Sequence, residues 1–175
     1  LLSNLPDAIT TDFENVPAQA LASLAGDRPV APAASAVGIA QDRILEKAHF
    51  TRCAAASGVG CAPYAVIESA AHLAAVPATL LPGILKTARM GYDGKGQQTV
   101  HTADELARAW EATGSVPCVL EKRLPLAAEC SVIVARSADG RSVHFPVERN
   151  LHRGGILAVT GVHDQVRPTA LAQQA

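Results

Sequence analysis

Residues 84–97 read Ile84-Leu85-Lys86-Thr87-Ala88-Arg89-Met90-Gly91-Tyr92-Asp93-Gly94-Lys95-Gly96-Gln97. The apolar start of this segment predicts a strand, and the remainder predicts a loop. Its three glycines allow positive φ angles and bring backbone N–H groups close to an anion. Three cationic side chains in the same segment supply the positive charge that a polyphosphate needs. We therefore predict a phosphate-binding loop.

This loop differs from the two common glycine-rich nucleotide motifs. In a P-loop, Ser or Thr follows the Gly-Lys pair, whereas Gly96 follows Gly94-Lys95 here. The glycine spacing does not match the dinucleotide pattern Gly-x-Gly-x-x-Gly either. Residues 98–101 predict a second strand, which places the glycines at the tip of a hairpin. A hairpin tip can close over a ligand.

The composition argues against several functional classes. The chain has 175 residues, of which 49% are apolar and 18% charged, and this is typical of a globular protein. A formal net charge of -1 without a basic run argues against a nucleic-acid surface, and no apolar run approaches the roughly 18 residues of a membrane span. The four cysteines lack Cys-x-x-Cys spacing, which argues against a zinc site and predicts free thiols.

Residues 91–97 resemble the glycine-rich phosphate loop of the 5-(carboxyamino)imidazole ribonucleotide synthases, an ATP-grasp family of de novo purine synthesis. Matching segments follow in the family's order from about Ile9 to Ala158. The resemblance implies that ATP drives the carboxylation of 5-aminoimidazole ribonucleotide with bicarbonate. The products are 5-(carboxyamino)imidazole ribonucleotide, ADP and phosphate. It also implies a cytoplasmic enzyme and, in the full-length protein, a homodimer.

The expected fold class is α+β. The resemblance implies an incomplete ATP-grasp fold over residues 34–175, preceded in residues 1–33 by the end of an α/β pre-ATP-grasp domain and a connector. From the residues alone, 7–16 read as the end of a strand and 17–25 as a helix with Pro17 in its first turn. A peripheral β-α unit of the same domain remains the alternative for this segment.

Two lysines are predicted to bind phosphate. We expect Ser35 to cap a helix that residues 41–50 continue, and Lys47 lies at the edge of the apolar face of this helix. Lys86 lies in an apolar strand, where burying an unpaired ammonium would cost several kcal/mol. We expect phosphate to be its partner, and a lysine that reaches solvent at a sheet edge is the alternative. The resemblance implies that both lysines contact the nucleotide.

The other nucleotide contacts follow from the resemblance. A strand over 117–124 becomes charged at its end, and Glu121-Lys122-Arg123-Leu124 resembles the hinge whose backbone groups hold adenine. Glu129 opens a strand over 129–136 and corresponds to the acid that accepts hydrogen bonds from the ribose hydroxyls. His152 corresponds to a histidine that lines the nucleotide site.

Lys86, Tyr92 and Asp93 are the predicted catalytic residues. The resemblance implies that Tyr92 and Asp93 face the bicarbonate or the imidazole substrate. ATP-grasp enzymes hold Mg²⁺ with carboxylates that end in an Asn-Glu pair, and we expect these ligands beyond residue 175. The chain is therefore expected to be an internal fragment that does not turn over alone, and no residue in it is predicted to bind metal.

Two further elements have clear local signals. Thr102-Ala103-Asp104-Glu105 predicts a capping box that opens a helix over 104–113, with Trp110 on its buried side. Asp139-Gly140 predicts the turn of a hairpin between the strand over 129–136 and a returning strand over 141–147.

Other functional interpretations stay open. A different ATP-grasp carboxylase or ligase, such as a biotin carboxylase or a formate-using purine transformylase, shares the loop, the hinge and the lysines. Tyr92-Asp93 and the Asn150-x-His152 pair favour the aminoimidazole enzyme. A non-catalytic nucleotide-binding domain or a purely structural domain is the more distant alternative, and nucleotide titration separates it.

Overall fold

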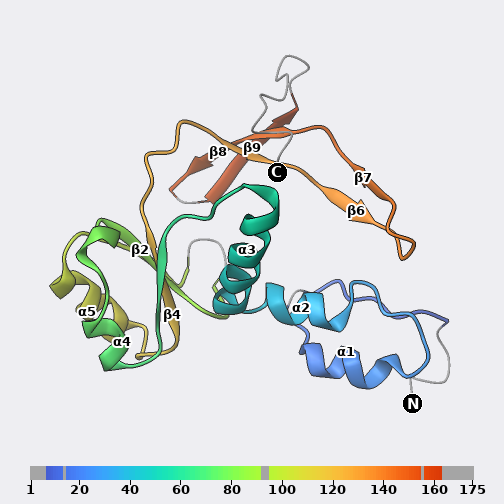
Figure 1. The fold of residues 1–175 in the computed structure, drawn as a ribbon, viewed down its shortest axis with the longest axis horizontal. Coiled ribbons are helices and arrows are strands. Elements are labelled where there is room, and N and C mark those ends of the chain that lie inside the picture. The colour runs from blue at the N-terminus through green and yellow to red at the C-terminus, as the bar shows by residue number, and fades with distance from the viewer. Residues whose placement is uncertain (1–6, 14, 92–94, 155, 163–175) are drawn as a thin grey trace. The chain divides into compact units, whose positions relative to one another are not determined.

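The computed structural model describes residues 7–13, 15–91, 95–154 and 156–162, and the chain divides into two units (Figure 1). Unit 1 comprises Leu1–Arg52 and Cys61–Arg123, whereas unit 2 comprises Cys53–Gly60 and Leu124–Ala175. Among the helices of the described ranges, none is both long enough and apolar enough to cross a membrane.

Two short helices form the first part of unit 1. Helix α1 spans Ala18–Ala25 directly after Pro17, as predicted, and helix α2 spans Ala34–Ala40 and packs against it (Figure 1). Ile9 and Val30 form an isolated parallel bridge. The predicted order of an extended segment followed by a helix is therefore confirmed.

Helix α3 spans Arg43–Ser57, and Gln41 and Asp42 separate it from α2. The prediction of a helix capped by Ser35 and running through 41–50 is wrong, because Ser35 lies inside α2. The carboxylate of Asp42 instead accepts a hydrogen bond from the N–H of Ile44 at 3.0 Å. A short acidic side chain that satisfies the first free N–H groups favours the start of a new helix at this point.

Unit 1 contains a four-stranded antiparallel sheet in the order β1-β4-β2-β3. Its strands are β1 (Tyr64–Ile67), β2 (Gly83–Thr87), β3 (Gln97–Val100) and β4 (Cys118–Lys122). β2 and β3 form the predicted hairpin, in which Lys86 lies opposite Gln97. The second strand thus begins one residue earlier than predicted.

The helical elements of this sheet region are α4 (Ala70–Ala74), the 3-10 helix η2 (Ala78–Leu80) and α5 (Ala103–Ala112). α5 begins at the predicted capping box. The hydroxyl of Thr102 accepts the N–H of Glu105 at 3.2 Å, and the carboxylate of Glu105 accepts the N–H of His101 at 2.7 Å. These bonds satisfy backbone donors that a helix start leaves unpaired.

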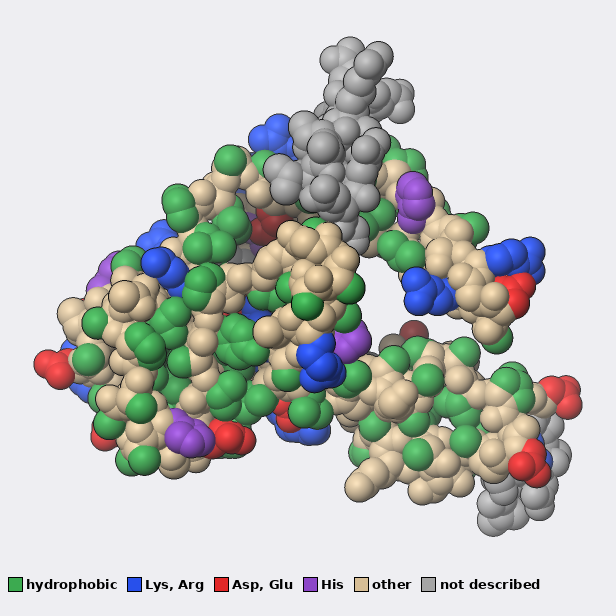
Figure 2. Space-filling model, in the orientation of Figure 1, with side chains coloured by type: hydrophobic (Ala, Val, Ile, Leu, Met, Phe, Trp, Pro, Cys, Tyr) green, Lys and Arg blue, Asp and Glu red, His purple; other side chains and the backbone are tan. Residues whose placement is uncertain are grey.

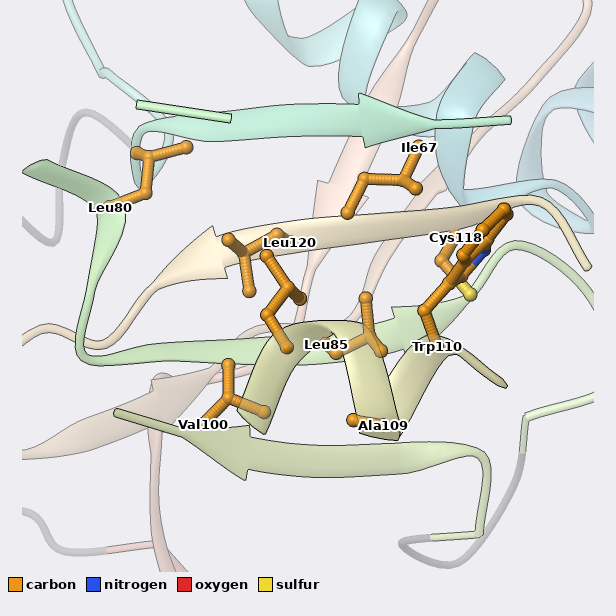
Figure 3. Close-up of a cluster of buried hydrophobic side chains, with 9 residues drawn as sticks. Ile67, Leu80, Leu85, Val100, Ala109, Trp110, Cys118 and Leu120 are labelled. Carbon is orange, nitrogen blue, oxygen red and sulfur yellow. The ribbon is translucent and has the colours of Figure 1, made fainter. Parts of the chain in front are cut away.

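The core of unit 1 lies between one face of the sheet and α5 (Figure 3). Its buried side chains are Ile67, Leu80, Leu85, Val100, Leu106, Ala109, Trp110, Cys118 and Leu120. The indole N–H of Trp110 donates to the carbonyl of Val116 at 3.0 Å, so its one polar group is satisfied. Because side chains alternate along a strand, burying Leu85 and Leu120 turns Lys86 and Glu121 toward the opposite face.

Unit 2 contains two small antiparallel sheets. The first has the order β5-β8-β9, and the second pairs β6 with β7. The strands are β5 (Glu129–Ser131), β6 (Val134–Arg136), β7 (Ser142–His144), β8 (Glu148–Arg153) and β9 (Ile156–Val162). The single strand predicted over 129–136 is therefore wrong, because its two halves pair with different partners.

The predicted Asp139-Gly140 turn is confirmed between β6 and β7. Gly140 has a φ of 86°, and the carboxylate of Asp139 pairs with Arg141 at 2.7 Å. Figure 2 shows charged side chains of both signs spread over the visible face, with Lys or Arg and acidic side chains together in the region of this hairpin.

Candidate functional site

Three charged side chains of unit 1 meet on the sheet face opposite α5. The Nζ of Lys47 lies 3.2 Å from the Oε2 of Glu121, and the Nζ of Lys86 lies 3.1 Å from the same oxygen. The three side chains are only 12%, 19% and 11% exposed. We call Lys47, Lys86 and Glu121 the charged triad.

The local structure explains why these residues converge. β2 and β4 pair so that Ile84 lies opposite Glu121, and Lys86 follows two residues later on the same face. Lys47 comes from α3, whose Thr51 hydroxyl lies 3.1 Å from the hydroxyl of Tyr64 in β1. The sheet register and the position of this part of α3 therefore bring both ammonium groups to one carboxylate.

In the structure Lys86 pairs with the carboxylate of Glu121, and its contact with phosphate stays a prediction. Burial by itself raises the pKa of Glu121, but the charges and hydrogen bonds of Lys86 and Lys47 outweigh it, so the net pKa is lowered. The second oxygen, Oε1, is buried and has no hydrogen-bond partner among the described residues.

We expect Glu121→Gln to lower the free energy of unfolding by about 1–3 kcal/mol at neutral pH, since two poorly exposed ammonium groups lose their counter-charge. The lowered pKa in the folded chain means that the carboxylate contributes stability that is fully present above the unfolded pKa of about 4.3. That contribution is lost as the pH falls through the lower folded pKa. The difference in the free energy of unfolding between wild type and variant should therefore become smaller at acidic pH.

Urea unfolding of both proteins at a series of pH values measures this difference. Glu111→Gln, a change of the same kind at an exposed position of α5, serves as the control and should show little difference throughout. If the loss of unfolding free energy caused by Glu121→Gln stays constant down to acidic pH, the stabilising ion pairs of Glu121 with the two lysines are contradicted.

The hairpin tip has one position that requires glycine, Gly96, and one where a side chain would be crowded, Gly91. The N–H of Thr87 donates to the carbonyl of Gly96 at 2.8 Å, and Gly96 has a φ of 73°. A Cβ on Gly96 would lie 2.6 Å from the Oγ1 of Thr87, and one on Gly91 would lie 3.3 Å from the carbonyl oxygen of Lys95. Three loop residues of the sequence prediction, Tyr92, Asp93 and Gly94, lie outside the described residues.

The predicted hinge coincides with the division of the chain. Unit 1 ends at Arg123, and the longer segment of unit 2 begins at Leu124. The N–H groups of Lys122 and Arg123 donate to the carbonyls of Pro63 at 2.8 Å and Pro82 at 3.0 Å. These bonds fix the end of β4 within unit 1.

Unit 2 brings the remaining two predicted residues together. The Nδ1 of His152 lies 3.3 Å from the Oε2 of Glu129, and both side chains are partly exposed. Pairing of β5 with β8 places Glu129 opposite Asn150 and so positions it near His152. A carboxylate beside an imidazole can accept hydrogen bonds from a ligand and orient the ring.

A pocket of about 450 Å³ in unit 1 brings the predicted loop residues Arg89 and Gly91 together with Asp12, Arg43 and Glu46, to which sequence reasoning gave no role. Its lining includes Asp12, Asn15, Arg43, Glu46, Arg89 and Gly91. The Nε of Arg43 is buried and lacks a hydrogen-bond partner among the described residues, and Arg89 pairs with Asp42 at 2.9 Å. Nothing local in the sequence of residues 41–43 indicates that they border a pocket.

The described ranges contain no group of three or more His, Cys, Asp and Glu side chains that could hold a metal ion. The Mg²⁺ that the resemblance implies stays a prediction, with its ligands expected beyond residue 175.

Comparison with known proteins identifies two family models. The ATP-grasp domain model matches residues 52–175, which is more than half of the chain, and the ribonucleotide synthetase preATP-grasp domain model matches residues 2–41. These matches confirm the predicted fold class, an incomplete ATP-grasp fold preceded by the end of a pre-ATP-grasp domain.

The chain is similar to curated N5-carboxyaminoimidazole ribonucleotide synthases. It is 38% identical to the enzyme from Pseudomonas aeruginosa, with 91% of this chain and 43% of the relative covered. It is also 38% identical to the enzyme from Brucella melitensis, with 99% and 46% covered. The chain thus spans less than half the length of these relatives.

A solved structure shares this architecture. N5-carboxyaminoimidazole synthetase from Staphylococcus aureus, complexed with ADP, superposes with a TM-score of 0.85 at 31% identity and covers 99% of this chain and 46% of its own. The resemblance seen in the loop, the two family models and these relatives agree with one another. The chain therefore belongs to the ATP-grasp family.

Proposed function

We propose that this chain provides the ATP side of an N5-carboxyaminoimidazole ribonucleotide synthase. Such an enzyme would use ATP to activate bicarbonate and would carboxylate the exocyclic amine of 5-aminoimidazole ribonucleotide, releasing ADP and phosphate, in cytoplasmic purine synthesis. The observation that carries the proposal is the convergence of Lys47 and Lys86 on one oxygen, in a chain whose relatives bear that name.

The proposed contacts with the phosphates of ATP are argued from the charge and the position of the residues. Phosphoryl transfer needs mainly the alignment of reactants and the neutralisation of spreading negative charge. In this proposal Lys47, Lys86, Lys95 and the glycine-rich segment 91–97 contact the phosphates, and each charge-assisted contact contributes about 1.5–3 kcal/mol. Lys86 has the catalytic role because it comes from the rigid strand β2.

The nucleoside side is proposed from the resemblance. Residues 121–124 would hold the base at the end of β4, the carboxylate of Glu129 would accept the ribose hydroxyls, and His152 would line the site. The 3.3 Å pairing of Glu129 with His152 supports this assignment, because each side chain restricts the orientation of the other.

The acceptor substrate would lie in the 450 Å³ pocket of unit 1. That pocket borders Gly91, which directly precedes Tyr92 and Asp93, the residues predicted to face bicarbonate or the imidazole ring. The buried Nε of Arg43 offers a donor that an anionic or carbonyl oxygen could use.

Residues 1–33 would form the end of the preceding domain, and residues 34–175 would form the ATP-grasp part. The complete enzyme would form a homodimer.

Calorimetric titration of the 175-residue chain with ATP, ADP and AMP, each with magnesium, tests the nucleotide assignment. ATP and ADP should bind at least about tenfold more tightly than AMP, because the proposed lysines act on the β- and γ-phosphates. Circular dichroism serves as the control for folding. A folded chain that binds none of the three nucleotides, or binds AMP as tightly as ATP, would overturn the proposal.

A further inference from the structure

Tyr64 contacts Lys47 of the charged triad in two ways. The Nζ of Lys47 lies 6.0 Å from the centroid of the Tyr64 ring, a distance at which the ring face attracts an ammonium group. The hydroxyl of Tyr64 lies 3.1 Å from the hydroxyl of Thr51, which follows Lys47 by one turn of α3. Tyr64 therefore reaches both the charged end of the lysine and the part of the helix that carries it.

The two hydrogen bonds of Thr51 have a fixed direction. Its hydroxyl donates to the carbonyl oxygen of Lys47 at 2.8 Å, because a carbonyl can only accept. A hydroxyl has a single hydrogen, so Thr51 must accept from Tyr64, and the phenol O–H is the donor. A continuous chain of hydrogen bonds thus runs from the sheet, through Thr51, to the backbone of Lys47.

Helix α3 depends on such contacts for its position. None of its residues, all of which are described, is buried, and no side chain of α3 belongs to the core cluster of unit 1. Tyr64 is half-buried on β1 and lies opposite Glu121 on β4, which places their two side chains on the same face of the sheet. The ammonium group of Lys47 therefore has the carboxylate as its ion-pair partner and the ring as a second neighbour.

We propose that Tyr64 is a positioning residue for Lys47. Its hydroxyl, acting through Thr51, fixes the helical turn that carries the lysine, and its ring keeps the ammonium group within the charged triad. The inference rests on the proposed function, in which Lys47 contacts the phosphates of ATP. A lysine side chain has many rotamers, and ordering it around a ligand costs entropy. Tyr64 lowers that cost without itself contacting a phosphate.

Calorimetric titration of the 175-residue chain with ATP and AMP tests this role. Tyr64→Phe keeps the ring and removes only the hydroxyl, so the affinity for ATP should fall by about three- to tenfold while the affinity for AMP changes little. Thr51→Val removes the same hydrogen bond from the other side and should cause a similar fall. Thr51→Ser keeps a hydroxyl and should restore most of the affinity that Thr51→Val loses. Because both changes break one bond, the double variant should bind ATP about as tightly as the weaker single variant.

Lys47→Ala distinguishes positioning from a general effect on the fold. If Tyr64 acts through Lys47, adding Tyr64→Phe to Lys47→Ala should change the affinity for ATP by less than about twofold. A change that distorted the whole site would weaken ATP binding by the same factor in both backgrounds. Where Lys47→Ala binds ATP too weakly to titrate, the comparison of Thr51→Val with Thr51→Ser decides.

The outcomes separate this inference from the function on which it rests. If Lys47→Ala weakens ATP binding but a folded Tyr64→Phe variant binds ATP as tightly as wild type, the positioning role is overturned and the nucleotide site stands. An equal effect of Tyr64→Phe in both lysine backgrounds overturns it too. If Lys47→Ala binds ATP as tightly as wild type, the positioning role fails because Lys47 then contacts no phosphate. If the folded wild type binds no ATP, both proposals fail. If circular dichroism shows that Tyr64→Phe does not fold, the two Thr51 variants decide.

Discussion

Leu120→Ala is expected to lower the free energy of unfolding by about 2–5 kcal/mol, because the change leaves a cavity in the core of unit 1. Leu120 is 0% exposed and lies on β4, an interior strand of the four-stranded sheet. Its side chain belongs to the cluster that also contains Leu85 and Trp110 (Figure 3). Neighbours fixed on two strands and a helix cannot collapse fully into the space that the leucine leaves.

Urea unfolding followed by circular dichroism measures this loss. Leu45→Ala is the matched control, since Leu45 is 47% exposed on α3 and loses little buried area on truncation. A Leu120→Ala protein that unfolds at the same urea concentration as the wild type would mean that this cluster is not the core of unit 1.

Lys86→Ala is expected to weaken ATP binding by at least about tenfold, or about 1.4 kcal/mol. Two effects act in the same direction. The phosphates lose a charge-assisted donor, and the carboxylate of Glu121, which loses one of its two cations, repels them more strongly. The loss of affinity should be larger for ATP and ADP than for AMP.

Calorimetric titration of wild type and variant measures this change. Arg108→Ala removes a cation from an exposed position of α5, outside the triad, and should alter the affinity little. If Lys86→Ala remains folded and binds ATP as tightly as wild type, the purely structural alternative is favoured over the nucleotide site.

The parts of the fold that depend on neighbours in sequence could be predicted. Alternation along β2 placed Leu85 in the core and Lys86 on the other face, and the capping box at Thr102 and Glu105 gave the start of α5. The Asp139-Gly140 turn gave the β6–β7 hairpin. In each case a few consecutive residues carry the physical cause, which is a strand period, a pair of cap bonds or a positive φ.

The parts that depend on long-range register could not be predicted. Lys86 and Glu121 are far apart in the chain and meet only because β2 pairs with β4 in one register. Sequence reasoning therefore did not find the pairing of Lys86 with Glu121. The same limit explains the undivided strand over 129–136, since only pairing partners show that β5 and β6 belong to different sheets.

The junction between α2 and α3 helps to fix the positions of Lys47 and Lys86 relative to each other. At this junction the N–H of Arg43 donates to the carbonyl of Ala88 at 2.8 Å, and Asp42 pairs with Arg89. The helix that carries Lys47 is thus fastened to the segment that directly follows the strand of Lys86. The two ammonium groups are thus held together before any ligand binds, so a nucleotide that bound there as proposed would not have to order them, and much of the entropy cost of ordering these side chains would already be met on folding.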